Sequence, residues 1–142
     1  MMRYLLAASA LVLVAPVGAQ ACAMDPYPYA VVFGSRAADI PEGYVAIQIE
    51  VDDWPRGSWV FVAKVVDGPS SILGKDVRIM PENLSSCTTF GRKEGYAVVS
   101  RQPVKIEGQT TLTAIAYERS WLDYIWHLFG FDLYKSPGKI AE

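Results

Sequence analysis

The chain has 142 residues, of which 51% are hydrophobic and 20% are charged, and its formal net charge at pH 7 is −2. This length suits a single domain built around one hydrophobic core. The slightly negative charge argues against nucleic acid as a partner, because surfaces that bind nucleic acid carry a basic patch or stripe.

The N-terminus has the three-part pattern of a secretory signal peptide. Arg3 supplies a positive charge, residues 4–14 form an apolar run, and the small residues Ala19 and Ala21 follow. The apolar run is too short for a transmembrane helix, which needs about 20 residues. We therefore expect cleavage after Ala21, or after Ala19 as second choice, and a mature protein that is secreted or periplasmic.

The two cysteines, Cys22 and Cys87, both survive this cleavage. In an oxidising compartment, two cysteines are expected to form one disulfide. An alternative is that Cys22 is lipidated, since bacterial lipoproteins also place a cysteine first after the signal. The residues before Cys22 lack the bulky aliphatic side chain typical of lipoprotein signals, and lipidation would leave Cys87 unpaired. The disulfide is the favoured interpretation.

The mature chain contains several strand patterns. Val45, Ile47 and Ile49 alternate with more polar residues, which is typical of a half-buried strand. Residues 59–66 are apolar on both faces apart from Lys64, which predicts a central strand. Strands are expected at residues 45–51, 59–66, 77–80, 96–101 and 110–118, with a possible further strand at 30–33.

The segments between these strands are expected to be irregular. Residues 81–95, which carry Cys87, form the longest such segment. Residues 68–76 read GPSSILGKD and superficially resemble a phosphate-binding loop. Their glycine spacing is one residue too long, and Asp76 stands where a Ser or Thr would hold magnesium, so we exclude this function.

Residues 120–129 change to a helical period, with Ser120 as a plausible N-cap and Gly130 as a plausible stop. Because the helix is so apolar, we expect it to pack on the same chain. An alternative is that it docks on a membrane surface or an envelope partner; its aromatic residues favour this, but it lacks a basic face. The tail at 135–142 is expected to be frayed. The candidate contact residues of the helix are Leu122, Ile125, Trp126 and Phe129.

Five strands without helical crossovers, plus a possible sixth, predict a mainly β fold in which an antiparallel sheet closes into a barrel. We expect a signal peptide at residues 1–21, a five-stranded OB-like barrel at 22–119, and a C-terminal helix and tail at 120–142 that pack on the barrel.

Residues 59–101, together with Cys22 at the mature N-terminus, resemble the netrin-like, or TIMP-like, version of the OB-fold. In that family a Gly-rich turn leads to a strand, a loop cysteine and the pattern F-x-x-(x)-G-x-Y-x-V-V. The resemblance implies that the first cysteine pairs with the loop cysteine. The matching residues are Gly74, Val77, Ile79, Cys87, Phe90, Gly95, Tyr96, Val98 and Val99.

Members of this family that inhibit metalloproteases carry Cys-x-Cys at the mature N-terminus. In this chain Met24 stands where the second cysteine would be. Metalloprotease inhibition is therefore kept as the second alternative function.

No enzymatic constellation is visible. The single histidine, His127, lies within the apolar helix pattern and cannot build a usual zinc site or a catalytic triad. We predict a small exported binding module that is not an enzyme and needs no cofactor, with a protein or small ligand of unknown identity as its partner. The alternative is an envelope-associated assembly protein that docks through residues 120–129. The candidate binding face consists of Trp54, Trp59, Tyr96 and Tyr117.

Overall fold

A computed structural model describes residues 28–85, 87–131 and 133–141 of the chain. Strands dominate this part of the protein, and one short helix lies near its C-terminal end. The elements are β1 (Tyr29–Val32), β2 (Tyr44–Glu50), β3 (Phe61–Asp67), β4 (Asp76–Pro81), β5 (Thr88–Gly91), β6 (Glu94–Ser100), β7 (Val104–Ile106), β8 (Gln109–Ile115), β9 (Tyr117–Arg119), α1 (Trp121–Leu128) and β10 (Pro137–Ile140).

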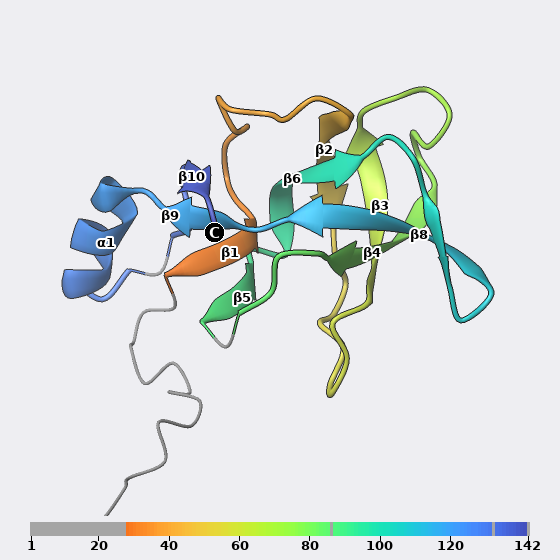
Figure 1. Ribbon diagram of the computed structural model, residues 1–142. Helices are drawn as coiled ribbons and strands as arrows, with labels where there is room; N and C mark the ends of the chain where they lie inside the picture. The colour runs from red at the N-terminus through yellow and green to blue at the C-terminus, as the bar shows by residue number, and fades with distance from the viewer. Residues whose placement is uncertain (1–27, 86, 132, 142) are drawn as a thin grey trace, which may run out of the picture.

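Five strands form a closed barrel in the order β4–β3–β2–β6–β8 (Figure 1). This confirms the predicted mainly β fold with an OB-like barrel and a C-terminal helix. Four of the pairings are antiparallel, whereas β4 and β8 close the barrel in parallel, with Ile79 opposite Leu112. The sequence pattern predicts an antiparallel barrel, and this one parallel pair departs from it. A closed ring with an odd number of strands cannot alternate direction everywhere, so one pair must be parallel.

The barrel interior is filled from alternate positions of its strands. Ile47 and Ile49 of β2 are buried, and so are Phe61 and Val65 of β3. The segment predicted at 59–66 is a central strand, β3, although Val62 on its outer face is 55% exposed. The strand has hydrogen-bonded neighbours on both sides, but its outer face meets solvent.

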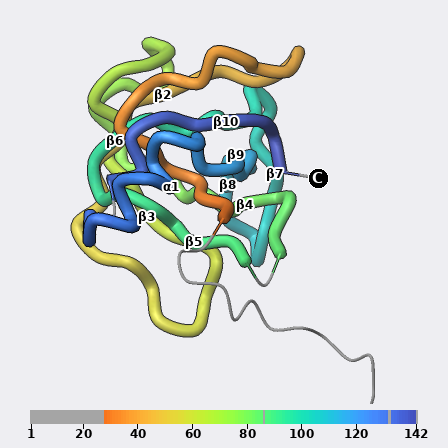
Figure 2. Tube along the Cα trace, turned by 90° about the vertical axis from the view of Figure 1, so that its left-hand side faces the viewer, coloured from red at the N-terminus to blue at the C-terminus, as the bar shows by residue number. Residues whose placement is uncertain are grey.

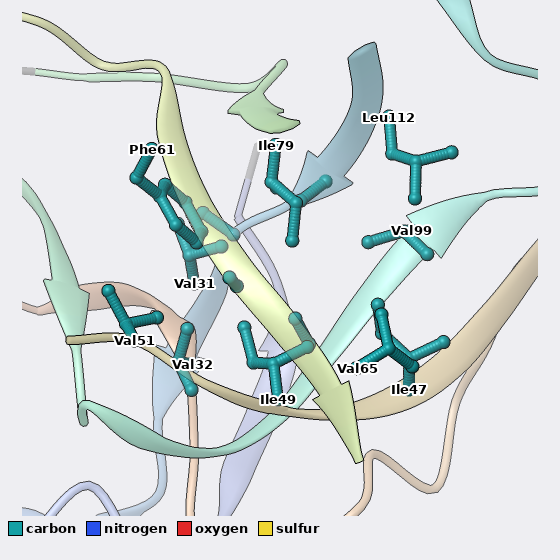
Figure 3. Close-up of a cluster of buried hydrophobic side chains, with 14 of the residues drawn as sticks. Val31, Val32, Ile47, Ile49, Val51, Phe61, Val65, Ile79, Val99 and Leu112 are labelled. Atoms are coloured by element: carbon teal, nitrogen blue, oxygen red, sulfur yellow. The ribbon is translucent and has the colours of Figure 1, made fainter. Parts of the chain in front are cut away.

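The buried side chains form a continuous cluster along the barrel (Figure 3). Val99 and Leu112 lie toward one end of this cluster, and Phe61 and Val51 lie toward the other. Burying side chains of this size stabilises the fold by about 1.5–3 kcal/mol each. The two ends of the cluster correspond to the two ends of the barrel.

A second sheet, in the order β10–β9–β1–β5, packs beside the barrel (Figure 1). The possible strand at 30–33 is therefore present as β1, which pairs in parallel with β5. Residues 81–95 and 102–109, expected to be irregular, contain β5 and β7. Strands β5 and β7 have four and three residues, which is too few for an alternation of apolar and polar side chains to be recognised in the sequence.

Two glycines allow the second sheet to approach the barrel closely. A Cβ atom at Gly95 would lie 2.1 Å from the carbonyl oxygen of Phe33, and one at Gly91 would lie 2.2 Å from that of Val32. No side chain fits at such distances. Phe33 and Tyr96 exchange two backbone hydrogen bonds. The Phe33 nitrogen donates to the Tyr96 carbonyl oxygen at 3.0 Å, and the Tyr96 nitrogen donates to the Phe33 carbonyl oxygen at 2.7 Å, so the second sheet is hydrogen-bonded to the barrel at this junction.

The prediction of a frayed tail is wrong. Strand β10 pairs with β9, and Asn83 ties the end of the chain to the barrel by donating hydrogen bonds from Nδ2 to the carbonyl oxygens of Ala116 and Ala141, at 3.0 and 2.9 Å. Ala141 is buried. Strand β10 is short and has few apolar residues, so its sequence shows no alternation of apolar and polar side chains. It becomes a strand by pairing with the edge of β9.

Candidate functional site

The sequence-predicted binding face does not exist as one surface. Trp54 stacks on Phe90 with ring centroids 4.6 Å apart, and Trp59 lies 5.1 Å from the same ring. Phe61 contacts both Trp54 and Phe90 edge-on. These aromatic side chains close one end of the barrel, which gives Trp54 mainly a packing role and leaves Trp59 partly exposed, at 39%.

Tyr96 and Tyr117, the other two candidates, lie at the junction with the second sheet. Tyr117 is fully buried, and its hydroxyl donates a 2.7 Å hydrogen bond to the carbonyl oxygen of Asp39. Burial, and secondarily the negative charge of Asp39, raises the pKa of Tyr117 to about 12. Tyr96 is half-buried beside Phe33. Tyr117 belongs to a second buried cluster, whereas Trp54 and Phe90 pack against the cluster inside the barrel.

Helix α1 is mounted with its apolar side chains facing outward. It lies at the left-hand end of the molecule in Figure 1 and so faces the viewer in Figure 2. Asp123 is its one buried residue. The expectation that the helix packs its apolar face on the same chain is therefore wrong for most of that face. The exposed fractions are 75% for Trp121, 62% for Leu122, 44% for Trp126, 74% for Leu128, 71% for Phe129 and 53% for the adjacent Phe131.

The polar residues of α1 attach it to the domain. The Asp123 carboxylate accepts a 3.0 Å hydrogen bond from the backbone nitrogen of Ser136. Ser120 caps the helix as predicted, with its hydroxyl oxygen 3.3 Å from the Asp123 nitrogen. Gly130 adopts the left-handed conformation after the helix and donates to the His127 carbonyl, as expected for a stop. Thus the polar side of the helix faces the protein and the apolar side faces outward.

The other notable feature is a cleft of about 590 Å³ at the end of the barrel opposite the aromatic cluster. Its floor is apolar and comes from four strands, with Val45, Val77, Val99 and Leu112 as the floor residues. Ile72 from the β3–β4 loop forms a wall. The loop is held in place by its own backbone, since Gly74 donates a 2.8 Å hydrogen bond to Val65.

The residues that line the cleft also include polar ones, among them the two arginines Arg78 and Arg101. The Arg78 side chain is 20% exposed and lies 3.8 Å from the Glu107 carboxylate, which is 85% exposed. A surface ion pair of this length contributes little stability. Asp76 also lies on the rim. Arg78 is thus a largely shielded cation with a solvent-exposed, weakly held counter-ion.

Comparison of the chain with known protein families, curated proteins and solved structures finds no match. The resemblance to netrin-like domains therefore stays a prediction. The part of the chain that the structure describes contains no cluster of His, Cys, Asp and Glu side chains that could hold a metal ion. Within the same residues, no helix has the length and hydropathy needed to span a bilayer.

The predicted cleavage positions Ala19 and Ala21, and Cys22, lie outside the described residues. No cysteine within them is free, but the pairing of Cys87 with Cys22 stays a prediction. The barrel-end cleft was missed by sequence reasoning, although residues 68–76, whose pattern excluded a phosphate loop, form one of its walls. A cleft built from the ends of four strands has no local sequence signal.

Proposed function

We propose that this protein is an exported, non-enzymatic module that attaches to the surface of a lipid bilayer through the outward apolar face of α1. The observation that carries this proposal is the orientation of α1, which turns its polar side toward the domain and most of its large apolar side chains toward solvent. Large exposed apolar patches are unusual on soluble monomers and mark interaction sites. Here the exposed side chains belong to one ordered element whose polar side is used for attachment to the domain.

The composition of this face favours a bilayer as its partner. Trp121 and Trp126 are of the residue type that concentrates at membrane interfaces, and Leu122, Leu128 and Phe129 supply side chains that insert into the acyl boundary. The helix lies at one extremity of the molecule, where it can contact a flat surface without interference from the barrel (Figure 1).

The charges near the helix set a limit on the electrostatic part of this binding. Helix α1 has no lysine or arginine, and the nearest basic residues that follow it, Lys135 and Lys139, are exposed. Two lysines add modest attraction to anionic lipid, about 1 kcal/mol each when close to the surface. Binding should therefore depend mainly on apolar insertion and change little with salt.

The test is co-sedimentation of the mature chain with phosphatidylcholine vesicles, with and without about 20 mol% of an anionic lipid. We expect binding to both vesicle types, with a blue shift of tryptophan emission as Trp121 and Trp126 leave water. The double variant Leu122→Ser/Phe129→Ser should lose binding. The matched control Val62→Ser removes an exposed apolar side chain on the barrel and should bind normally.

Two outcomes would overturn the bilayer as the partner. One is the absence of vesicle binding by a folded chain. The other is a concentration-dependent dimer, observed by sedimentation velocity, that the α1 double variant abolishes while vesicle binding is absent from both proteins. That second result would assign the same face to another copy of the chain.

A further inference from the structure

We infer that the cleft at the open barrel end is a binding site for a small amphiphile with one apolar chain and one anionic head group, of the kind represented by a medium-chain carboxylate. This inference is independent of the proposed bilayer attachment, since the cleft and α1 lie at opposite sides of the molecule. In Figure 1, the β3–β4 loop that borders the cleft is at the upper right and α1 is at the far left.

The volume and floor of the cleft match an apolar chain. About 590 Å³ falls within the range of 300–1,000 Å³ that is typical of small-molecule sites. The floor is continuous with the hydrophobic core, because Val99 and Leu112 belong to the buried cluster and Val45 and Val77 pack against it. An acyl chain placed there extends the core outward and leaves water without losing any hydrogen bond.

The rim supplies the partner for an anionic head. Arg78 is shielded, so it interacts with a charge more strongly than a fully exposed side chain does. Its ion pair with Glu107 is long, and Glu107 lies in the two-residue turn between β7 and β8. A carboxylate bound at the rim would displace Glu107 into solvent, where the turn leaves it room to move.

Arg101 adds a second guanidinium to the same rim. Its backbone is fixed by a 2.8 Å hydrogen bond from its nitrogen to the carbonyl oxygen of Gly43. Ser100, Gln109 and Thr110 also line the cleft, where the Ser100 hydroxyl bonds to the backbone of Gln102 and the Thr110 hydroxyl accepts a hydrogen bond from Lys105. The two arginines face two carboxylates, since Asp76 lines the cleft and Glu107 pairs with Arg78, so a ligand carboxylate that displaces Glu107 keeps the charges at the rim balanced.

The experiment compares decanoate with 1-decanol by isothermal titration calorimetry, each below the concentration at which it aggregates. We expect saturable one-to-one binding of decanoate, and binding of decanol that is at least several-fold weaker. Arg78→Gln should lower decanoate affinity about tenfold and leave decanol affinity unchanged. Glu107→Gln, which releases Arg78, should raise decanoate affinity about two- to threefold.

Two further variants locate the site. Thr110→Trp places a large side chain at an exposed rim position and should abolish binding of both probes while circular dichroism shows a folded barrel. The α1 variant Leu122→Ser/Phe129→Ser should bind decanoate normally. The inference is overturned if decanoate binding does not saturate. It is also overturned if Arg78→Gln and Thr110→Trp both leave the affinity for decanoate unchanged, or if the α1 variant is the one variant that no longer binds decanoate. Equal affinity for decanol would overturn the anionic head and leave an apolar site.

Discussion

Strand β3 and helix α1 each separate apolar from polar side chains, yet they turn their apolar sides in opposite directions. In β3 the interior residues Phe61 and Val65 are buried, while Lys64 faces solvent. In α1 the acidic Asp123 is buried, and Phe129 faces solvent at 71% exposure. An amphipathic pattern therefore defines which residues share a face. It leaves open whether that face meets the protein's own core or a partner.

The largest difference between the two regions should appear when one apolar side chain is removed from each. Ile79→Ala in the barrel deletes a fully buried side chain and should lower the free energy of unfolding by about 4 kcal/mol. Leu122→Ala in the helix should change it by less than about 0.5 kcal/mol, because Leu122 is 62% exposed. Urea denaturation of both variants measures this. Similar losses would mean that the helix face packs on the domain in solution.

The junction between the barrel and the second sheet should be nearly as sensitive as the core. Gly95→Ala places a Cβ 2.1 Å from the Phe33 carbonyl oxygen, which forces two backbones apart and should cost about 3 kcal/mol. Gly57→Ala is a useful contrast, since its added Cβ meets no atom within 4 Å but its φ of 71° is unfavourable for alanine. A loss for Gly95→Ala no larger than for Gly57→Ala would contradict the close approach.

Within α1, the buried polar side chain should matter more to stability than the exposed apolar ones. Asp123→Ala leaves the Ser136 nitrogen without its side-chain acceptor and should lower the free energy of unfolding by about 2 kcal/mol. Leu128→Ala, at a 74% exposed position, is the matched control and should be nearly neutral. Vesicle binding should show the opposite order, with Leu128→Ala the more damaging. If both assays rank the two variants in the same order, the apolar side of α1 does not face outward in solution.

The smallest expected effect concerns high pH. The pKa of Tyr117 is raised to about 12 in the folded protein, above its ordinary value of 10.0. The folded state thus keeps a proton that the unfolded state has lost, so the stabilising contribution is complete below pH 10 and is lost as pH rises toward 12. The melting temperature of the native chain should fall across this window, and Tyr117→Phe should reduce that fall.

Tyr44 must be controlled in this measurement, since its hydrogen bond to Glu82 also raises its pKa. We therefore compare Tyr44→Phe with the double variant Tyr44→Phe/Tyr117→Phe. Identical pH dependence of the two would show that Tyr117 contributes nothing.

The parts of the fold that the sequence predicted are those with a local period. The alternation around Ile47 and the helical period around Trp126 each identified an element and its start within a few residues. The short strands β5 and β10 escaped because each pairs with a strand that is not its immediate neighbour in the chain or lies beyond the helix, β1 for β5 and β9 for β10. Strand β7 pairs with the adjacent β8, but its three residues are too few to show a period. The cleft escaped because its lining residues come from strands that are separated in the sequence.

The orientation of α1 escaped for a different reason. Hydrophobicity predicts burial because most apolar faces are satisfied within the chain, and an outward face breaks that rule. The signal was present in Asp123 and His127, whose side of the helix is the one that could hydrogen-bond to the domain. Residues that violate a general rule in this way are expected at functional surfaces.

The pairing of β1 has a consequence for the order in which the chain can fold. Tyr29, near the start of the described residues, pairs with Thr88 in β5 and with Glu118 in β9. The barrel likewise closes only when β8 reaches β4. Contacts so distant in sequence fold slowly, on the millisecond-to-second scale, because a long loop must be ordered before they form. A chain emerging N-terminus first cannot complete the pairing of β1 until nearly all of it has been released.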